Sequence, residues 1–349
     1  MTGNEAIGEG AIRAGCNFYA GYPITPQNEL IAYMAKRMIE EEGIFIQAES
    51  ELAAINMVLG ASVAGVRAMT SSSSPGISLK QEGISYLAGC QLPCVIVNIM
   101  RGGPGLGNIA PSQSDYFQAT KGGGHGDYRC IVLAPHSVQE AFDLMLLSFE
   151  LADFYRNPVI ILGDGMLGQM MESLKIKNQK SKIKNYKKPW VLNGCNNRKP
   201  NIIRSLYLAE GALEKLNLHL QKKYKIIQKR EQRYEGISLD DAKVIIVAYG
   251  TMARIAKSVV NKLRKKGKRV GLIRPITLWP FPKNVFIKLV DVPARKRANF
   301  LVIEMSYGQM LEDVKLSVDG RACIEFLGRA GGGIPSEEEI IKKVMSCKL

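Results

Sequence analysis

The stretch LPCVIVNIMRGGPGLG, residues 92–107, joins an apolar run to a glycine-rich loop. The apolar half is rich in β-branched residues and is apolar on both faces apart from Asn98, which is typical of a strand buried within a parallel sheet. The loop begins at Arg101, directly after the expected end of that strand. Because α/β sheets bind ligands beyond the carboxyl ends of their strands, we expect Arg101 at a binding edge.

The residues on either side alternate between strand-like and helix-like patterns from residue 1 to about 170. Further strands are expected at 17–21, 44–48, 66–70, 130–134 and 158–162. Helices are expected at 4–14, 29–42, 50–65 and 138–154, with another after the turn at 74–76. Strands that alternate with helices predict an α/β domain with a mostly parallel sheet covered on both faces.

The 349 residues of the chain are enough for two domains. The alternation stops at a segment that is first rich in lysine and asparagine and then helix-like, and it resumes at Lys243 with VIIVAYG. We therefore expect a first α/β domain over residues 1–174, a basic and partly helical linker over residues 175–240, and a second α/β domain over residues 241–349.

Composition narrows the class of protein. The chain is 46% hydrophobic and 23% charged, and it contains no apolar run of the roughly 20 residues that a membrane helix needs. The start MTGNEAIGEG lacks the basic and apolar parts of a secretion signal, so we expect a cytoplasmic protein with no membrane segment. The net charge of +15 is concentrated between Lys175 and Arg233, without interleaved aromatic residues. This pattern favours docking of an acidic protein, such as an electron carrier, over binding of nucleic acid.

The seven cysteines are irregularly spaced, so no disulfide framework is expected. The closest pair, Cys90 and Cys94, matches neither the zinc spacing C-x2-C nor the cysteine run of a ferredoxin. We expect buried thiols and no iron–sulfur cluster in this chain.

Four polar segments follow expected strands, at the edge where ligands bind. They are GYPITP at 21–26, QAESELAA at 47–54, TSSSSPG at 70–76 and RGGPGLG at 101–107. Together they predict a pocket with a carboxylate, several hydroxyls and a guanidinium, which suits a 2-oxoacid. Taken singly, Glu51 also fits a carboxylate that stabilises a helix N-terminus, and Ser71 to Ser74 also fit turn and capping residues.

The stretches YPITP, ESELAAINMVLGAS, TSSSSPGISLKQEGISYLAG, LPCVIVNIMRGGPGLG and PSQSDYFQATKGGGHGDYR closely resemble the alpha subunit of 2-oxoacid:ferredoxin oxidoreductases. The resemblance covers residues 3 to about 172. It resumes from about 241 to 335, where VIIVAYGTMARIAK, GLIRPITLWPFP and VIEMSYGQM are similar to a transketolase-C-terminal-like domain. RGGPGLG and KGGGHGDY are most similar to the branched-chain (2-oxoisovalerate, or 3-methyl-2-oxobutanoate) type. Residues 175–240 resemble no family that we can place.

The resemblance implies a thiamine-diphosphate-binding pyrimidine domain followed by the second α/β domain. It implies oxidative decarboxylation of branched-chain 2-oxoacids to acyl-CoA and CO2, with reduction of ferredoxin, by a multi-subunit complex. Three alternatives stay open: a 2-oxoglutarate:ferredoxin oxidoreductase, a non-catalytic assembly or binding subunit of the same fold, and another thiamine enzyme.

The resemblance also implies roles for matched residues. Glu51 would lie against N1′ of the thiamine aminopyrimidine and exchange a proton with it, as the catalytic acid–base group. Thr25 and Arg101 would bind the substrate, the hydroxyl near its oxo group and the guanidinium on its carboxylate. The remaining cofactor-binding positions are Pro23, Ile24, Ser73 and Ser74.

The implied partners follow from what this chain lacks. Gly163-Asp164-Gly165 resembles the start of the metal motif of thiamine enzymes, but the next asparagine pair, Asn196-Asn197, lies beyond the lysine-rich segment. We interpret the glycines as a turn at a strand end and expect no metal ligands here. Mg²⁺, the diphosphate and the nearest iron–sulfur cluster would belong to a beta subunit, with gamma and ferredoxin-like delta subunits completing a complex that uses coenzyme A and ferredoxin.

Overall fold

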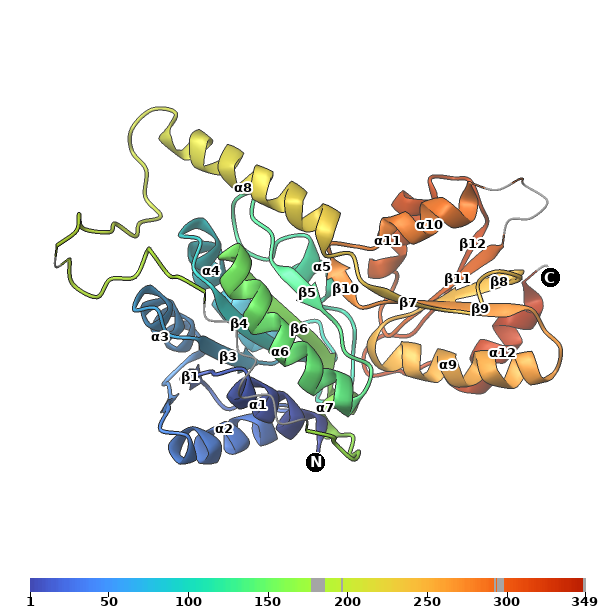
Figure 1. Cartoon of the computed structure of the whole chain (residues 1–349). Coiled ribbons are helices and arrows are strands. Elements are labelled where there is room, and N and C mark those ends of the chain that lie inside the picture. The colour runs from blue at the N-terminus through green and yellow to red at the C-terminus, as the bar shows by residue number, and fades with distance from the viewer. Residues whose placement is uncertain (177–185, 196, 292, 294–297, 348–349) are drawn as a thin grey trace.

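The computed structural model describes residues 1–176, 186–195, 197–291, 293 and 298–347. Two α/β units lie side by side: the first is blue to green in Figure 1 and the second is orange to red. Within the expected linker, residues 177–185 and Asn196 lie outside the described residues. Over the described ranges, no helix is both long and apolar enough to cross a membrane.

The first unit is built on a seven-stranded sheet with the order β10-β5-β6-β4-β3-β1-β2. All neighbouring pairs are parallel except β10 with β5. The strands are β1 (Phe18–Gly21), β2 (Ile44–Gln47), β3 (Ala68–Ser72), β4 (Cys94–Met100), β5 (Ile131–Leu133), β6 (Pro158–Asp164) and β10 (Thr277–Trp279). Strand β4 is buried along its whole length, as its apolar sequence predicted.

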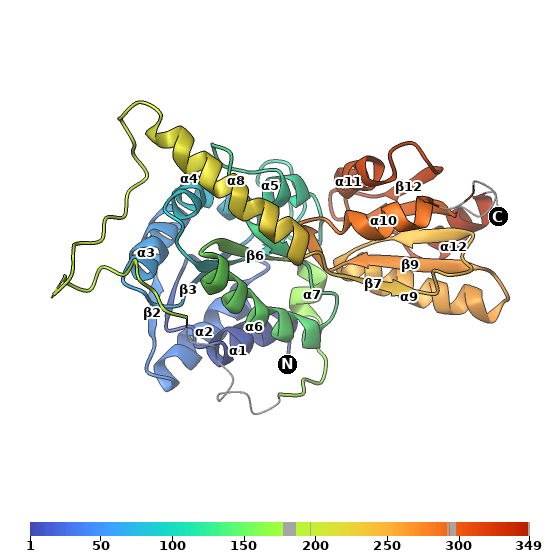
Figure 2. The same cartoon turned by 45° about the horizontal axis from the view of Figure 1, so that its top comes forward.

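Helices cover both faces of this sheet. Helices α1, α2 and α6 pack together on one face, and α3 packs with α4 on the other (Figures 1 and 2). The helices are α1 (Gly3–Arg13), α2 (Asn28–Glu40), α3 (Glu51–Val63), α4 (Ser74–Gly89), α5 (Tyr116–Thr120), α6 (Val138–Tyr155) and α7 (Gly165–Gln169). The mostly parallel α/β architecture expected from the sequence is confirmed.

The second unit has a five-stranded sheet with the order β12-β11-β8-β9-β7. Its strands are β7 (Tyr234–Ile237), β8 (Val244–Val247), β9 (Val270–Pro275), β11 (Asn299–Glu304) and β12 (Ile324–Gly328), and its helices are α9 (Gly250–Lys265), α10 (Lys283–Val290), α11 (Gln309–Val318) and α12 (Glu337–Ser346). Strand β7 falls within residues 175–240, where we expected only a linker with some helix. It pairs antiparallel with β9, and its side chains are exposed or half-buried, so it carries no strong apolar signal.

The two units are joined by hydrogen bonds and by a shared strand. Strand β10, which follows the second unit's β9, completes the edge of the first sheet. Gln113 donates to the Tyr249 carbonyl at 2.9 Å and accepts from the Met305 amide at 3.0 Å. Helix α8 (Ala212–Arg230), yellow in Figure 2, runs along the first unit and ends near this junction. The arrangement makes the edge of the first sheet a composite of both halves of the chain.

Candidate functional site

The expected site lies at the carboxyl edge of the first sheet. Strands β4, β3, β1 and β2 are consecutive neighbours and run parallel, so the segments that follow them emerge at one edge. The segments with Arg101, Ser73, Thr25 and Glu51 follow these four strands in that order. Their gathering is therefore a consequence of strand order, in the way that parallel sheets place binding residues.

Arg101 connects two of these segments. Its Nη1 donates to the Thr25 carbonyl at 3.0 Å, and its Nη2 donates to the Leu106 carbonyl at 3.0 Å. The side chain is buried, and its Nε has no hydrogen-bond partner among the described residues. The Thr25 hydroxyl, which is half-buried, accepts from Asn28 Nδ2 at 3.2 Å. Arg101 thus holds the GYPITP turn against its own glycine loop and keeps one unpaired donor.

The serines after β3 differ in their hydrogen bonding. Ser74 accepts from the Arg101 amide at 3.0 Å and donates to Asp115 Oδ2 at 2.7 Å, so its hydroxyl is already paired. Burial raises the pKa of Asp115, although the hydrogen bonds from Ser74 and Asn98 oppose the rise. The hydroxyls of Ser72 and Ser73 are buried, and neither has a partner within the described ranges. The unpaired hydroxyls are those available to a ligand.

Glu51 begins α3, directly after the capping residue Ser50, whose hydroxyl accepts from the Ala53 amide at 3.1 Å. Only 6% of Glu51 is exposed. Its carboxylate lies above the first turn of α4, since a Cβ added to Gly76 would come within 2.5 Å of Glu51 Oε1 and 2.1 Å of Ser72 Oγ. Across the part of the chain that the structure describes, no side chain donates a hydrogen bond to this carboxylate.

Lys80 is a residue near the site that our sequence interpretation missed. It is fully buried, and its Nζ donates to Thr70 Oγ1 at 3.0 Å and to the Glu51 carbonyl at 3.3 Å. Burial lowers the pKa of Lys80 to about 7, and the charge of Glu51 opposes this shift. A lone lysine in a helical pattern normally indicates a solvated side chain. The available signal was its place between Gly76 and Gly83, on the helix face that approaches α3.

The other expected cofactor positions lie in the turn after β1. Pro23 is exposed and Ile24 is half-buried, and the turn is held by the bond from Arg101 to Thr25. The structure therefore joins Thr25, Ser74 and Arg101 through direct hydrogen bonds, and it brings Glu51 beside Ser72. The assignment of substrate and cofactor roles among them stays a prediction.

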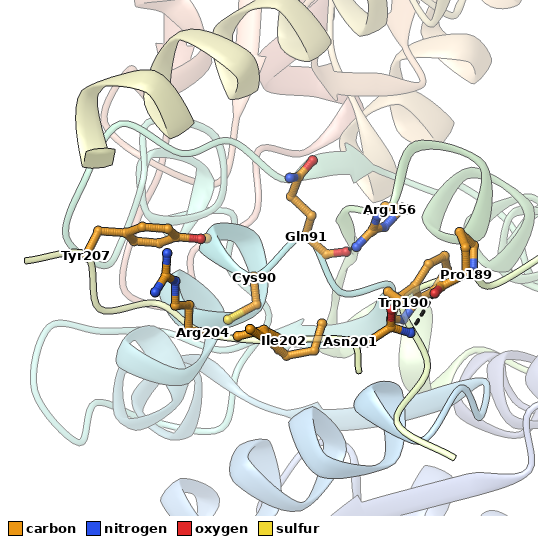
Figure 3. Close-up of a pocket in the computed structure, with 11 residues that line it drawn as sticks. Cys90, Gln91, Arg156, Pro189, Trp190, Asn201, Ile202, Arg204 and Tyr207 are labelled. Atoms are coloured by element: carbon orange, nitrogen blue, oxygen red, sulfur yellow. Dashed lines mark hydrogen bonds between the residues drawn. The ribbon is translucent and has the colours of Figure 1, made fainter. Parts of the chain in front are cut away.

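A pocket of about 330 Å³ lies elsewhere, beside the segment that leads to α8 (Figure 3). Its two arginines are stacked on aromatic rings: the Arg156 guanidinium is 4.3 Å from the Trp190 ring centre, and that of Arg204 is 4.7 Å from the Tyr207 ring centre. None of the expected site residues lines this pocket. It is therefore separate from the binding edge.

The turn expected at Gly163-Asp164-Gly165 is instead a direct junction: Gly163 and Asp164 belong to β6, and Gly165 begins α7. Asp164 ends β6 and caps α7, accepting from the Met166 amide at 3.0 Å and the Leu167 amide at 3.1 Å. Burial raises the pKa of this carboxyl, and its hydrogen bonds oppose the rise. In the described ranges, no three His, Cys, Asp or Glu residues gather in a way that would hold a metal ion.

The residues of the binding edge fit the pyrimidine end of thiamine diphosphate. The Glu51 carboxylate and the unpaired hydroxyls of Ser72 and Ser73 supply acceptors and donors for a heteroaromatic ring. Because Gly76 has no side chain, the Glu51 carboxylate and the Ser72 hydroxyl occupy the space beside it, where a Cβ would lie within 2.5 Å of both. Arg101 Nε adds an unpaired donor of the kind that binds a carboxylate.

Comparison with known proteins agrees with this geometry. Residues 9–237 match the family profile "Pyruvate flavodoxin/ferredoxin oxidoreductase, thiamine diP-bdg". The chain belongs to this family. Residues 242–340 match "Pyruvate:ferredoxin oxidoreductase core domain II". The expected family is confirmed, and most of residues 175–240, which resembled no family that we could place, fall inside the first match.

Two named proteins are similar to this chain over almost its whole length. Ketoisovalerate oxidoreductase subunit VorB of Methanothermobacter marburgensis is 50% identical, over 99% of this chain and 96% of the relative. 2-Oxoglutarate synthase subunit KorA of Methanothermobacter thermautotrophicus is 36% identical, over 99% of this chain and 97% of the relative. The first of these relatives is named as an oxidoreductase subunit, in agreement with the expected enzyme class.

Solved structures also resemble the chain, and two of them are informative. One is 2-oxoglutarate:ferredoxin oxidoreductase from Magnetococcus marinus with 2-oxoglutarate, coenzyme A and succinyl-CoA bound. It has a TM-score of 0.85 and 27% identity over 99% of this chain, which spans only 64% of that longer chain. The other is a split gene transketolase, an inactive beta4 tetramer, with a TM-score of 0.61 and 12% identity over 99% of this chain and 97% of that chain. The second likeness shows a shared fold alone.

Proposed function

We propose that this chain is the pyrimidine-binding subunit of a complex that oxidatively decarboxylates branched-chain 2-oxoacids to acyl-CoA and CO2 and reduces ferredoxin. The observation that carries the proposal is the Glu51 carboxylate, buried above Gly76 beside the unpaired Ser72 hydroxyl. The branched-chain substrate is supported by the greater identity to the ketoisovalerate subunit, 50%, than to the 2-oxoglutarate subunit, 36%.

Glu51 would hold the cofactor and move a proton. Thiamine diphosphate, when bound, supplies the nucleophilic carbon and the electron sink that decarboxylation of a 2-oxoacid requires. Glu51 is suited to proton exchange with the aminopyrimidine because its carboxylate is shielded from water and is unpaired within the described structure. Ser73, Ser74, Pro23 and Ile24 would line the same surface, with Ser73 offering its unpaired hydroxyl.

Arg101 and Thr25 would hold the substrate. Two nitrogens of Arg101 are engaged by neutral main-chain carbonyls, so its positive charge is not neutralised by either contact. A 2-oxoacid carboxylate that reached the unpaired Nε would gain a charge-assisted hydrogen bond. The Thr25 hydroxyl accepts one hydrogen bond from Asn28 and retains its own proton for the substrate's oxo group.

A second subunit would complete the site. Apolar side chains stand exposed in and near the glycine loop: Leu106 is 79% and Ile109 is 65% exposed, and Tyr307 in the second unit is 81% exposed. Asn108, between these two loop residues, donates to the Gly331 carbonyl at 3.0 Å, so the loop also contacts the second unit. We assign this surface to the beta subunit, which would bring Mg²⁺ and the nearest iron–sulfur cluster, while gamma and delta subunits complete a cytoplasmic complex that uses coenzyme A.

The test is Glu51→Gln in the assembled complex. The amide cannot exchange a proton as a carboxylate does, so we expect oxidation of 2-oxoisovalerate to be abolished while the subunits still assemble. Glu82→Gln is the matched control, because Glu82 is exposed on α4 and pairs only with Tyr86 in the described structure. Near-normal turnover by Glu51→Gln would remove Glu51 from the proposed role.

A second variant tests the substrate contact. Arg101→Ala should mainly raise KM for the 2-oxoacid, because the guanidinium contacts the carboxylate of the bound substrate, and this group loses its charge as it leaves as CO2. Steady-state kinetics over a range of 2-oxoisovalerate concentrations measure the change. An unchanged KM would exclude Arg101 from the carboxylate site.

A further inference from the structure

A fully buried lysine, Lys80, donates a hydrogen bond to the main chain of the proposed catalytic glutamate. Lys80 lies on the face of α4 that packs on α3, and Gly76 and Gly83 lie on the same face, four residues before it and three after it. A Cβ added to Gly83 would come within 2.6 Å of Ile55 on α3, so the two helices approach closely there. The glycines leave space for the long side chain of Lys80 between the helices.

The contacts of Lys80 converge on the start of α3. Its ammonium donates to the Glu51 carbonyl, at the residue whose carboxylate stands above Gly76, and to Thr70 on β3. Among the described elements packed around Lys80, Glu51 supplies the charge that acts on it and Thr70 faces it with a hydroxyl. The lysine therefore links a strand to the first helical turn that carries the proposed catalytic group.

The energetic cost of burying Lys80 indicates that this residue has a role beyond filling space. A charge taken out of water is costly unless it is paired, and here no carboxylate of the described chain lies within ion-pair distance of Nζ. An apolar side chain of similar length, such as methionine, would fill the same space without that cost. Packing alone therefore does not account for a lysine at this position.

We propose that Lys80 is a positioning residue for Glu51: its side-chain nitrogen fixes the first turn of α3, and with it Glu51, against β3. This inference rests on the proposed function of Glu51. Lys80 itself touches the main chain of Glu51 and the Thr70 hydroxyl, so it acts through Glu51 rather than on the substrate.

The experiment is Lys80→Met in the assembled complex, with kcat and KM measured from pH 6 to 9. We expect kcat to fall roughly tenfold or more while KM changes less than about threefold, because the loss concerns the reacting group and not substrate binding. The kcat profile should also lose the limb that reports the titration of Lys80, because burial lowers the pKa of this lysine to about 7, within the range measured. Lys223→Met is the matched control: burial also lowers the pKa of Lys223 to about 7, but this lysine lies on α8 and donates to the carbonyl of Arg156, which caps the C-terminal end of α6.

Binding of thiamine diphosphate gives a readout independent of turnover. Calorimetric titration of cofactor-free complexes should show weaker binding to Lys80→Met than to the wild type, and no further weakening when Lys80→Met is added to Glu51→Gln. An equal effect of Lys80→Met in both backgrounds would mean a purely structural role and would overturn the proposal. So would a Lys80→Met complex with wild-type kcat and an unchanged pH profile.

Thr70→Val provides a second variant if Lys80→Met does not assemble. It keeps the lysine and removes one of its two hydrogen bonds, so it should lower kcat in the same pattern but by a smaller factor. A Thr70→Val enzyme with unchanged kcat and an unchanged pH profile would overturn the proposal. Normal turnover by Glu51→Gln would instead refute the proposed function, so the two failures are distinguishable.

Discussion

Gly76→Ala should inactivate the enzyme without unfolding the protein. The added methyl carbon would lie 2.5 Å from Glu51 Oε1 and 2.1 Å from Ser72 Oγ, whereas ordinary contacts of this kind are 3.4–4 Å. The carboxylate must therefore move by about 1 Å, and a misplacement of that size in an active site costs roughly 100-fold in rate. That factor corresponds to about 2.7 kcal/mol of transition-state stabilisation.

Stability should respond differently from rate. Alanine is favoured over glycine in a helix by up to about 1 kcal/mol, which offsets part of the strain at this position. Gly60→Ala is the matched control: Gly60 lies on α3 itself, and beyond its own helical turn no atom of the described residues lies within 4 Å of an added Cβ. The assays are kcat of the complex and its melting temperature by circular dichroism. A Gly76→Ala enzyme with turnover within twofold of the wild type would refute the placement of Glu51 above Gly76.

Two further predictions concern stability and pH. The pKa of Lys80 falls from 10.5 to about 7 on folding, so the charged lysine destabilises the folded state fully below pH 7 and not at all above pH 10.5. Lys80→Met should therefore raise the free energy of unfolding by at most roughly 5 kcal/mol at pH 6, and urea titrations should show a smaller gain at pH 10. A lower free energy of unfolding for Lys80→Met at pH 6 would contradict this. Arg274 is buried and bonds to both Glu140 and Glu235, so Arg274→Ala should cost about 3–5 kcal/mol at pH 7. Burial alone would raise the pKa of Glu140, but His136 and Arg274 hold it below 4.5, so the ion pair of Glu140 with Arg274 stabilises the fold above pH 4.5. Calorimetry should therefore show a smaller difference in melting temperature between the wild type and Arg274→Ala below that pH.

The sequence was informative where local pattern and strand order agree. The apolar run before Arg101 becomes the fully buried β4, and the four segments expected to form a pocket do follow four adjacent parallel strands. The position of Glu51 in a first helical turn was predicted from its place after a strand, and Ser50 caps that helix as its residue type favours. Because neighbouring parallel strands end at the same edge of a sheet, the gathering of these segments could be predicted from the sequence.

The rest depends on contacts between distant residues. Strand β10 joins the first sheet from Thr277–Trp279, far along the chain from its partner β5, and three residues carry no signal for such pairing. The edge strand β7 has one exposed and one half-buried face, so its sequence resembles a polar linker. Lys80 is buried where Gly76 and Gly83 let α3 approach α4, and that approach is a property of the packed helices.

The central claim is that this chain serves a thiamine-dependent oxidation of branched-chain 2-oxoacids. The most direct measurement is reduction of ferredoxin by the intact complex, purified under anoxic conditions, with coenzyme A and either 2-oxoisovalerate, 2-oxoglutarate or pyruvate. The account predicts the highest kcat/KM for 2-oxoisovalerate and loss of that activity in Glu51→Gln. A preference for 2-oxoglutarate would contradict the substrate assignment, and an intact complex without thiamine-dependent activity would contradict the catalytic role of this chain.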